Sequence, residues 1–241
     1  MLLDFEELDF QVTPLGEISL RRRAEPRLEG KIIYEVKLGD EFLMSSLFTE
    51  AEIQLSKRGL AECGGTELDV VVGGLGLGYT ALAALENPSV RSLKVIDVMQ
   101  PVIDWHRRGL VPLGKDLVSD PRCSLIHADF FEVASSSAGG FDHAELPEQV
   151  HAVLLDIDHS PRHWLNPGNG DFYTVQGLRN LSDKLLPGGV FGLWSDDPPD
   201  AEFIELLDTV FSSTRSHLVT FPNPYTGSES SNTVYLACKG S

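Results

Sequence analysis

One stretch decides the fold of this chain: Asp69-Val70-Val71-Val72-Gly73-Gly74-Leu75-Gly76-Leu77-Gly78-Tyr79-Thr80. It joins a run of valines to four glycines within six positions, and the Ala- and Leu-rich run 81–85 follows. This order predicts a buried strand, a tight glycine turn and the start of a helix. Glycine suits a backbone that turns sharply against a ligand, and a helix N-terminus favours polar or anionic groups. The stretch therefore predicts a ligand-binding turn at the carboxyl edge of a parallel sheet.

The spacing of the glycines narrows the class of ligand. Gly74-x-Gly76-x-Gly78 is a GxGxG pattern, whereas the dinucleotide fingerprint is GxGxxG. The next apolar run, 93–97, ends in Asp97, at about the separation expected for a ribose-binding carboxylate. Because a carboxylate can accept hydrogen bonds from both ribose hydroxyls, the pattern favours an adenosine-type ligand. The alternative is a strand-turn-helix unit in which the glycines serve only close packing.

Strands and helices alternate around this stretch. Strands are expected over 68–73, 92–97, 123–127, 150–156 and 190–195, and helices over about 77–86, from 101, over 171–186 and over 200–212. Two last runs, 217–221 and 233–237, can pair antiparallel without a crossover helix. The alternation predicts an α/β fold with a doubly wound, seven-stranded sheet that is mostly parallel and has an antiparallel edge.

Residues 1–45 have a different pattern from the rest. Apolar and polar residues alternate over 17–21 and 31–37, and Gly39 interrupts the pattern. This predicts a small antiparallel β-hairpin unit, 1–45. The partly amphipathic run 46–61 predicts a helix that leads into a second domain, 46–241, of Rossmann-like type.

Composition excludes several classes of function. The chain has 241 residues, a formal net charge of -17 and three widely spaced cysteines. The negative field repels phosphate, which argues against a nucleic-acid partner. No apolar run is long enough to span a bilayer, and the acidic start lacks the basic residues of a signal peptide, so a cytoplasmic protein without a membrane partner is expected. The cysteines suggest neither a disulfide framework nor a CxxC metal site.

Acidic residues follow the ends of several predicted strands. Asp97 closes the second strand, Asp129 follows the third, Asp156 closes the fourth, and Asp196 and Asp197 follow the fifth. These ends share the sheet edge that carries the glycine turn, and clustered carboxylates repel one another unless a cation compensates. A cationic ligand is therefore expected there. Helix capping is the alternative for Asp129.

The segment after the fourth strand concentrates titratable groups. Asp156, Asp158 and His159 fall within four positions after a fully apolar strand, which favours a functional role for Asp156. A metal site that adds His163 was considered, but its spacing matches no standard site, so no metal is expected. Trp194 either walls a pocket or belongs to the core.

The order of these motifs resembles spermidine synthase and the other aminopropyltransferases, which share the Rossmann-like fold of S-adenosylmethionine-dependent methyltransferases. Gly73-Gly74-Leu75-Gly76 resembles the nucleoside loop of that family, and Asp97 stands where its ribose-binding acid stands. Asp129 resembles the acid that accepts from the adenine amino group, and Asp156 the first acid of the DxxDP segment. The resemblance implies a nucleoside-binding set of Gly73, Gly74, Leu75, Gly76, Gly78, Asp97, Val98, Asp129 and Phe130.

The chain departs from this family on the amine side. Its DxxDP segment is Asp156-Ile157-Asp158-His159-Ser160-Pro161, so His159 replaces the second acid or Asp158 takes its place. The glutamine that the family often carries near the fifth strand is Trp194 or Ser195 here. The acceptor is expected to contact Asp158, His159, Trp194, Asp196 and Asp197.

The resemblance implies a transferase that uses decarboxylated S-adenosylmethionine, or S-adenosylmethionine itself, to alkylate a small amine. Asp156 would serve as general base or as electrostatic anchor for the amine. Two alternatives remain: an S-adenosylmethionine-dependent methyltransferase with a small-molecule acceptor, and a non-catalytic nucleoside-binding protein. A dinucleotide oxidoreductase is disfavoured by the glycine spacing. A homodimer is implied by the resemblance alone.

Overall fold

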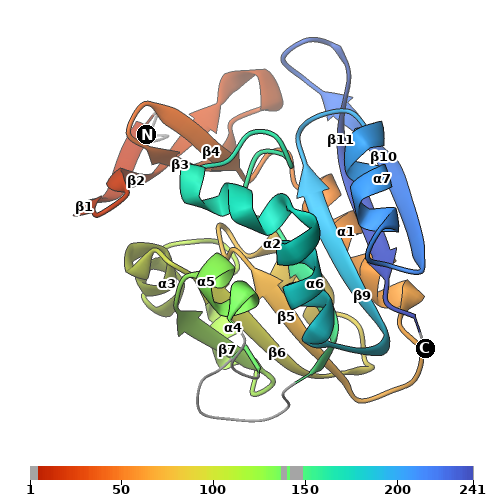
Figure 1. The fold of residues 1–241 in the computed structure, drawn as a ribbon. Coiled ribbons are helices and arrows are strands. Elements are labelled where there is room, and N and C mark those ends of the chain that lie inside the picture. Colours follow the sequence, from red (N-terminus) through yellow and green to blue (C-terminus); the bar gives the residue numbers. More distant parts are fainter. Residues whose placement is uncertain (1–4, 137–139, 142–148, 241) are drawn as a thin grey trace.

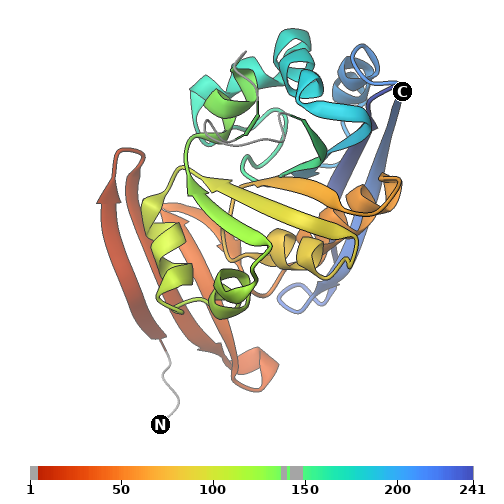
Figure 2. The ribbon, with the colours of Figure 1, turned by 90° about the horizontal axis from the view of Figure 1, so that it is seen from below.

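A computed structural model describes residues 5–136, 140–141 and 149–240 of the chain. Its described strands form a seven-stranded sheet, with helices on both faces, and a four-stranded sheet that lies to one side (Figures 1 and 2). No helix within these described ranges is long and apolar enough to cross a membrane.

The large sheet has the strand order β10-β11-β9-β8-β5-β6-β7. The pairings from β9 to β7 are parallel, whereas β11 runs antiparallel to both β9 and β10. This confirms the predicted mixed sheet with its antiparallel edge. The strands are β5 (Leu68–Gly73), β6 (Val90–Asp97), β7 (Cys123–His127), β8 (Val150–Leu155), β9 (Leu185–Ser195), β10 (Ser213–Asn223) and β11 (Ser228–Cys238).

The interior strand β5 separates two apolar cores, because its side chains alternate between the two faces of the sheet. Val70 and Val72 pack with α1 (Glu50–Glu62), α2 (Tyr79–Leu85), α3 (Gln100–Arg107) and α4 (Gly114–Ser119). Val71 packs on the other face with α5 (Phe130–Ser135), α6 (Val175–Asp183) and α7 (Ala201–Asp208). All six residues of β5 are buried, which explains its continuous apolar run.

The helix expected over 171–186 is shorter than predicted. A 3₁₀ segment, η2 (Pro167–Tyr173), precedes α6, which ends at Asp183. Leu185 already belongs to β9 and pairs with Val150 of β8. Strand pairing therefore ends the helix before its expected end at 186.

The small sheet contains β1 (Phe5–Thr13), β2 (Gly16–Glu25), β3 (Lys31–Leu38) and β4 (Glu41–Ser45), all paired antiparallel in chain order. The turn at Gly39 lies between β3 and β4, as predicted. Ile18, Leu20 and Val36 of this sheet join the apolar core that contains α1 to α4. The Trp105 indole of α3 also donates to Asp9 of β1, at 2.6 Å. These contacts hold the small sheet against the carboxyl ends of the parallel strands.

Candidate active site

A cavity of about 520 Å³ lies at the carboxyl ends of the parallel strands. The glycine turn and the ends of β6 and β8 form one side of it, and the small sheet, α1 and the β10–β11 hairpin contribute the rest. Ten of the predicted site residues line it: Gly74, Gly76, Asp97, Val98, Asp129, Phe130, Asp156, His159, Trp194 and Asp196. Five others do not: Gly73, Leu75, Gly78, Asp158 and Asp197.

The glycine turn needs its glycines for two separate reasons. Gly74 and Gly76 have φ angles of 94° and 46°, in the left-handed region that other residues rarely adopt. A Cβ on Gly74 would overlap with the backbone oxygen of Asp156, and one on Gly76 would overlap with the Met44 sulfur. The same Met44 sulfur accepts from the Leu77 N–H at 3.1 Å. The turn is therefore held tightly between the end of β8 and the small sheet.

Asp97 is positioned by the turn that it faces. Its Oδ2 accepts from the Leu75 N–H at 2.9 Å, and its Oδ1 accepts from the Met99 N–H at 2.7 Å. Burial raises the pKa of this carboxyl, and these backbone N–H groups oppose the rise. Because a carboxylate can accept about four hydrogen bonds, each oxygen retains a lone pair that a ribose hydroxyl could use.

We expect the replacement Asp97→Asn to weaken binding of 5′-methylthioadenosine at least tenfold. The amide loses the charge and one acceptor, and hydrogen bonds to charged groups are worth about 1.5–3 kcal/mol. Titration calorimetry measures the change. Asp104→Asn, on the exposed part of α3, is the matched control and should leave the affinity within about twofold. Equal affinities for the Asp97 variant and the parent chain would exclude a ribose contact.

Asp129 caps a helix and also lines the cavity. It is the N-cap of α5, where its Oδ1 accepts from the Phe131 N–H at 2.8 Å and the Glu132 N–H at 3.3 Å. Both of these bonds use Oδ1, and the side chain also lines the cavity. Capping fixes the orientation of the carboxyl and leaves Oδ2 to accept from a ligand.

Two buried carboxyl groups with raised pKa values line the cavity. Asp156 follows β8, and its Oδ2 accepts from the Thr80 hydroxyl at 2.6 Å. Burial raises the pKa of Asp156 to about 6, against the lowering effect of that hydrogen bond. Glu52 of α1 lines the same cavity and is only 6% exposed. Burial raises the pKa of Glu52 well above its usual value, and the charge of Asp156 adds to the rise.

Glu52 is outside the strand-end pattern that predicted the other acids, although the sequence does carry a signal for it. The buried face of α1 consists of Ala51, Glu52, Leu55, Ser56, Gly59 and Leu60, which recur at helical spacing. An acid on the apolar face of an amphipathic helix is unusual and marks a candidate site residue.

Asp158 lies outside the cavity, which corrects the expectation that it contacts the acceptor. The residue is fully buried, and its carboxyl accepts from the Leu165 N–H, the Asn169 amide and the Tyr173 hydroxyl, each at 2.8 Å. Three donors satisfy the buried charge and hold the chain between β8 and α6 in place. The role of Asp158 is structural.

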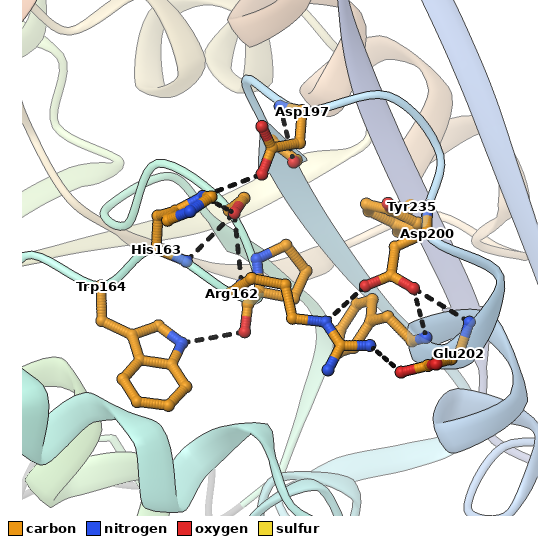
Figure 3. A network of polar contacts seen from close by, with 11 residues as sticks. Arg162, His163, Trp164, Asp197, Asp200, Glu202 and Tyr235 are labelled. Carbon is orange, nitrogen blue, oxygen red and sulfur yellow. Dashed lines mark hydrogen bonds and ion pairs between the residues drawn. The ribbon is translucent and has the colours of Figure 1, made fainter.

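Asp197 also lies outside the cavity, in the polar network of Figure 3. Its carboxyl is 3.0 Å from His163 Nδ1, and the Ser160 hydroxyl is 3.2 Å from the same nitrogen (Figure 3). A Ser-His-Asp relay needs the serine and the acid on opposite ring nitrogens, so this group is not a hydrolytic triad. Arg162 contacts Asp200 and Glu202 and joins the same turn to α7. The network therefore stabilises a turn and does not form a site.

The other acceptor-side residues do line the cavity. His159 Nε2 is 2.8 Å from a carboxyl oxygen of Glu41 in the small sheet. Asp196 accepts from the Asn232 amide at 2.6 Å, and its N–H donates to the His159 carbonyl at 2.7 Å. Trp194 contributes apolar surface. Among the residues described, no group of three or more His, Cys, Asp or Glu could hold a metal ion.

Comparisons with known proteins find relatives in sequence and in fold. No protein-family model matches the chain. Over 166 residues it is 29% identical to polyamine aminopropyltransferase 2 of Pseudomonas aeruginosa. The aligned region covers 64% of this chain and 43% of that protein. The chain therefore spans less than half the length of this curated relative.

Two solved structures share the fold. The spermidine synthase of Thermotoga maritima superposes with a TM-score of 0.73 at 18% identity, covering 97% of this chain and 73% of that one. A spermidine synthase in complex with the transition-state analogue AdoDATO superposes with a TM-score of 0.74 at 17% identity. This superposition covers 97% of this chain and 74% of that one. These comparisons confirm the resemblance to the aminopropyltransferases and the fold class that the sequence predicts.

Proposed function

We propose that this chain transfers an aminopropyl group from decarboxylated S-adenosylmethionine to an amine. The observation that carries the proposal is the charge of the cavity. Its described lining includes the acids Glu52, Asp97, Asp129, Asp156 and Asp196, and no lysine or arginine. Both substrates of such a transfer are cations, so a cavity of this charge suits them. At ~4 Å and an effective dielectric of about 20, one close charge pair is worth roughly 4 kcal/mol before desolvation is subtracted.

The proposed mechanism depends mainly on positioning. The nucleoside lies on the glycine turn, its ribose on Asp97 and its adenine amino group near Asp129. The amine nitrogen attacks the aminopropyl carbon bonded to the sulfonium, in line with the bond that breaks. A C–N bond forms, the C–S bond breaks with both electrons going to sulfur, and a neutral thioether leaves. Asp156 acts as anchor for the ammonium or as its base.

Calorimetry with the two donors tests this proposal. We expect decarboxylated S-adenosylmethionine to bind at least tenfold more tightly than S-adenosylmethionine, because the methionine carboxylate would enter an acidic cavity. Mass spectrometry of reactions with a panel of diamines and monoamines then reports aminopropyl transfer. Tighter binding of S-adenosylmethionine with methyl transfer would favour the methyltransferase alternative, which the altered segment after Asp156 motivates. Binding without any turnover would favour a nucleoside-binding protein.

We also propose a cytoplasmic homodimer, which the resemblance to the aminopropyltransferases supports. Size-exclusion chromatography with light scattering tests the oligomeric state, and a monomer at micromolar concentration would contradict it.

A further inference from the structure

Glu52 reaches the candidate active site from α1, an element separate from the strand ends that carry the other acids. One turn further along the same buried face, the Ser56 hydroxyl donates to the Thr80 carbonyl at 2.6 Å. The Thr80 hydroxyl in turn donates to Asp156. This chain of contacts aligns the Glu52 face of α1 with the end of β8. Glu52 and Asp156 therefore line the same cavity from two elements, close enough for the charge of Asp156 to raise the pKa of Glu52.

The two carboxyl groups differ in how they are supported. Asp156 has an oxygen that accepts from a hydroxyl, which favours its charged form. Within the described part of the chain, only the backbone N–H of Glu52 itself supports the Glu52 carboxyl. Burial with no side-chain donor favours the protonated form, so the pKa of Glu52 lies well above its usual value.

The described surroundings of Glu52 hold further acids and one neutral phenol, and the described cavity lining has no lysine or arginine. α1 contributes Glu50, α2 contributes Tyr79, and the end of β8 contributes Asp156. β9 brings Asp196 to the cavity, and the described cavity-lining residues of β10 and β11 are all non-ionisable. A positive charge that enters the cavity thus comes from a ligand.

We propose that Glu52 accepts the proton of the attacking amine, while the Asp156 carboxylate holds the positive charge of that amine. This inference rests on the proposed function and divides between two residues the role given above to Asp156. The empty enzyme holds Glu52 protonated, and an arriving ammonium ion displaces that proton to solvent. During attack one ammonium N–H proton moves to a Glu52 oxygen, which frees the nitrogen lone pair. The C–N bond then forms, the C–S bond breaks, and Glu52 returns to its protonated state.

Proton release on acceptor binding tests the role of Glu52. Calorimetry of the acceptor amine binding to the enzyme with 5′-methylthioadenosine, repeated at pH 7 in buffers of different ionisation enthalpy, counts released protons. We expect the parent chain to release up to one proton more than Glu52→Gln. The same replacement should lower kcat at least tenfold and leave nucleoside affinity within about twofold. A purely structural role would leave the proton count unchanged.

Glu62→Gln is the matched control, since it removes the same charge from the exposed end of the same helix, outside the cavity lining, and it should keep the parent's proton count and kcat. If Glu52→Gln does not fold, Glu52→Met replaces it, because an apolar side chain of similar volume avoids a buried amide. Equal proton counts and kcat in the parent and Glu52 variants would overturn the inference. A parent chain that transfers nothing to any amine would instead overturn the proposed function.

Discussion

The replacement Asp156→Asn is expected to lower kcat/KM for the amine by about a thousandfold. Asn has nearly the same shape, and the Thr80 hydroxyl can still donate to its side-chain oxygen, so the fold should persist. The variant loses one charge pair with the ammonium, and this pair is worth roughly 4 kcal/mol at an effective dielectric of about 20. Steady-state kinetics measure it, and Asp171→Asn, on the exposed side of η2, is the control. Unchanged turnover would show that Asp156 does not contact the amine.

The same replacement should stabilise the empty protein at neutral pH. Burial raises the pKa of Asp156 to about 6, above its ordinary value of 3.8. Between these two values the folded state binds more protons than the unfolded state, so stability from this group falls as pH rises. The loss of folding stability caused by ionising Asp156 is complete above pH 6 and absent below pH 4. Urea unfolding should therefore find Asp156→Asn more stable than the parent chain at pH 7.5, with the difference vanishing near pH 4; a gain independent of pH would contradict this.

The second large effect is expected from Gly74→Ala. Its new Cβ would overlap with the Asp156 backbone oxygen, and β8 cannot yield because β5 and β9 pair with it on both sides. The φ of 94° adds strain of about 1–3 kcal/mol. We expect a loss of at least about 2 kcal/mol in the free energy of unfolding and loss of measurable nucleoside binding.

Gly188→Ala separates the two causes. Gly188 has a φ of 75°, but nothing lies within 4 Å of an added Cβ. This control should show the conformational strain without the overlap, and nucleoside binding should be retained. Urea unfolding and calorimetry of both variants give the comparison. If both variants lost equal stability and equal nucleoside affinity, the overlap with the chain at the end of β8 would not explain the need for glycine at position 74.

The glycine-turn side of the cavity was predictable because its signals are local. The apolar run into Gly74 and Gly76, and the acid that ends the next strand, depend on backbone geometry that neighbouring residues determine. The strand that was not assigned, β1, has an irregular pattern because a bulge lies between Glu7 and Asp9. Local periodicity does not extend through such a bulge.

The amine side depended on contacts between distant segments. The sequence places Asp156 and Asp158 two positions apart, but Asp158 turns into the core toward Asn169 and Tyr173 while Asp156 meets the cavity. Which of two neighbouring acids is satisfied internally depends on donors 7, 11 and 15 residues further along the chain. Their proximity in the sequence therefore predicted two acids in the cavity, where the structure places one.

The amino-acid sequence by itself determined the mixed sheet, the glycine turn and the acids at the strand ends, because strand periodicity and glycine conformation are local properties. Only the tertiary structure brought Glu52 to Asp156 and directed Asp158 and Asp197 elsewhere. The pairing of two carboxyls across the cavity follows from how α1 packs against the sheet. Such packing is set by the shapes of whole elements, and no short stretch of sequence encodes it.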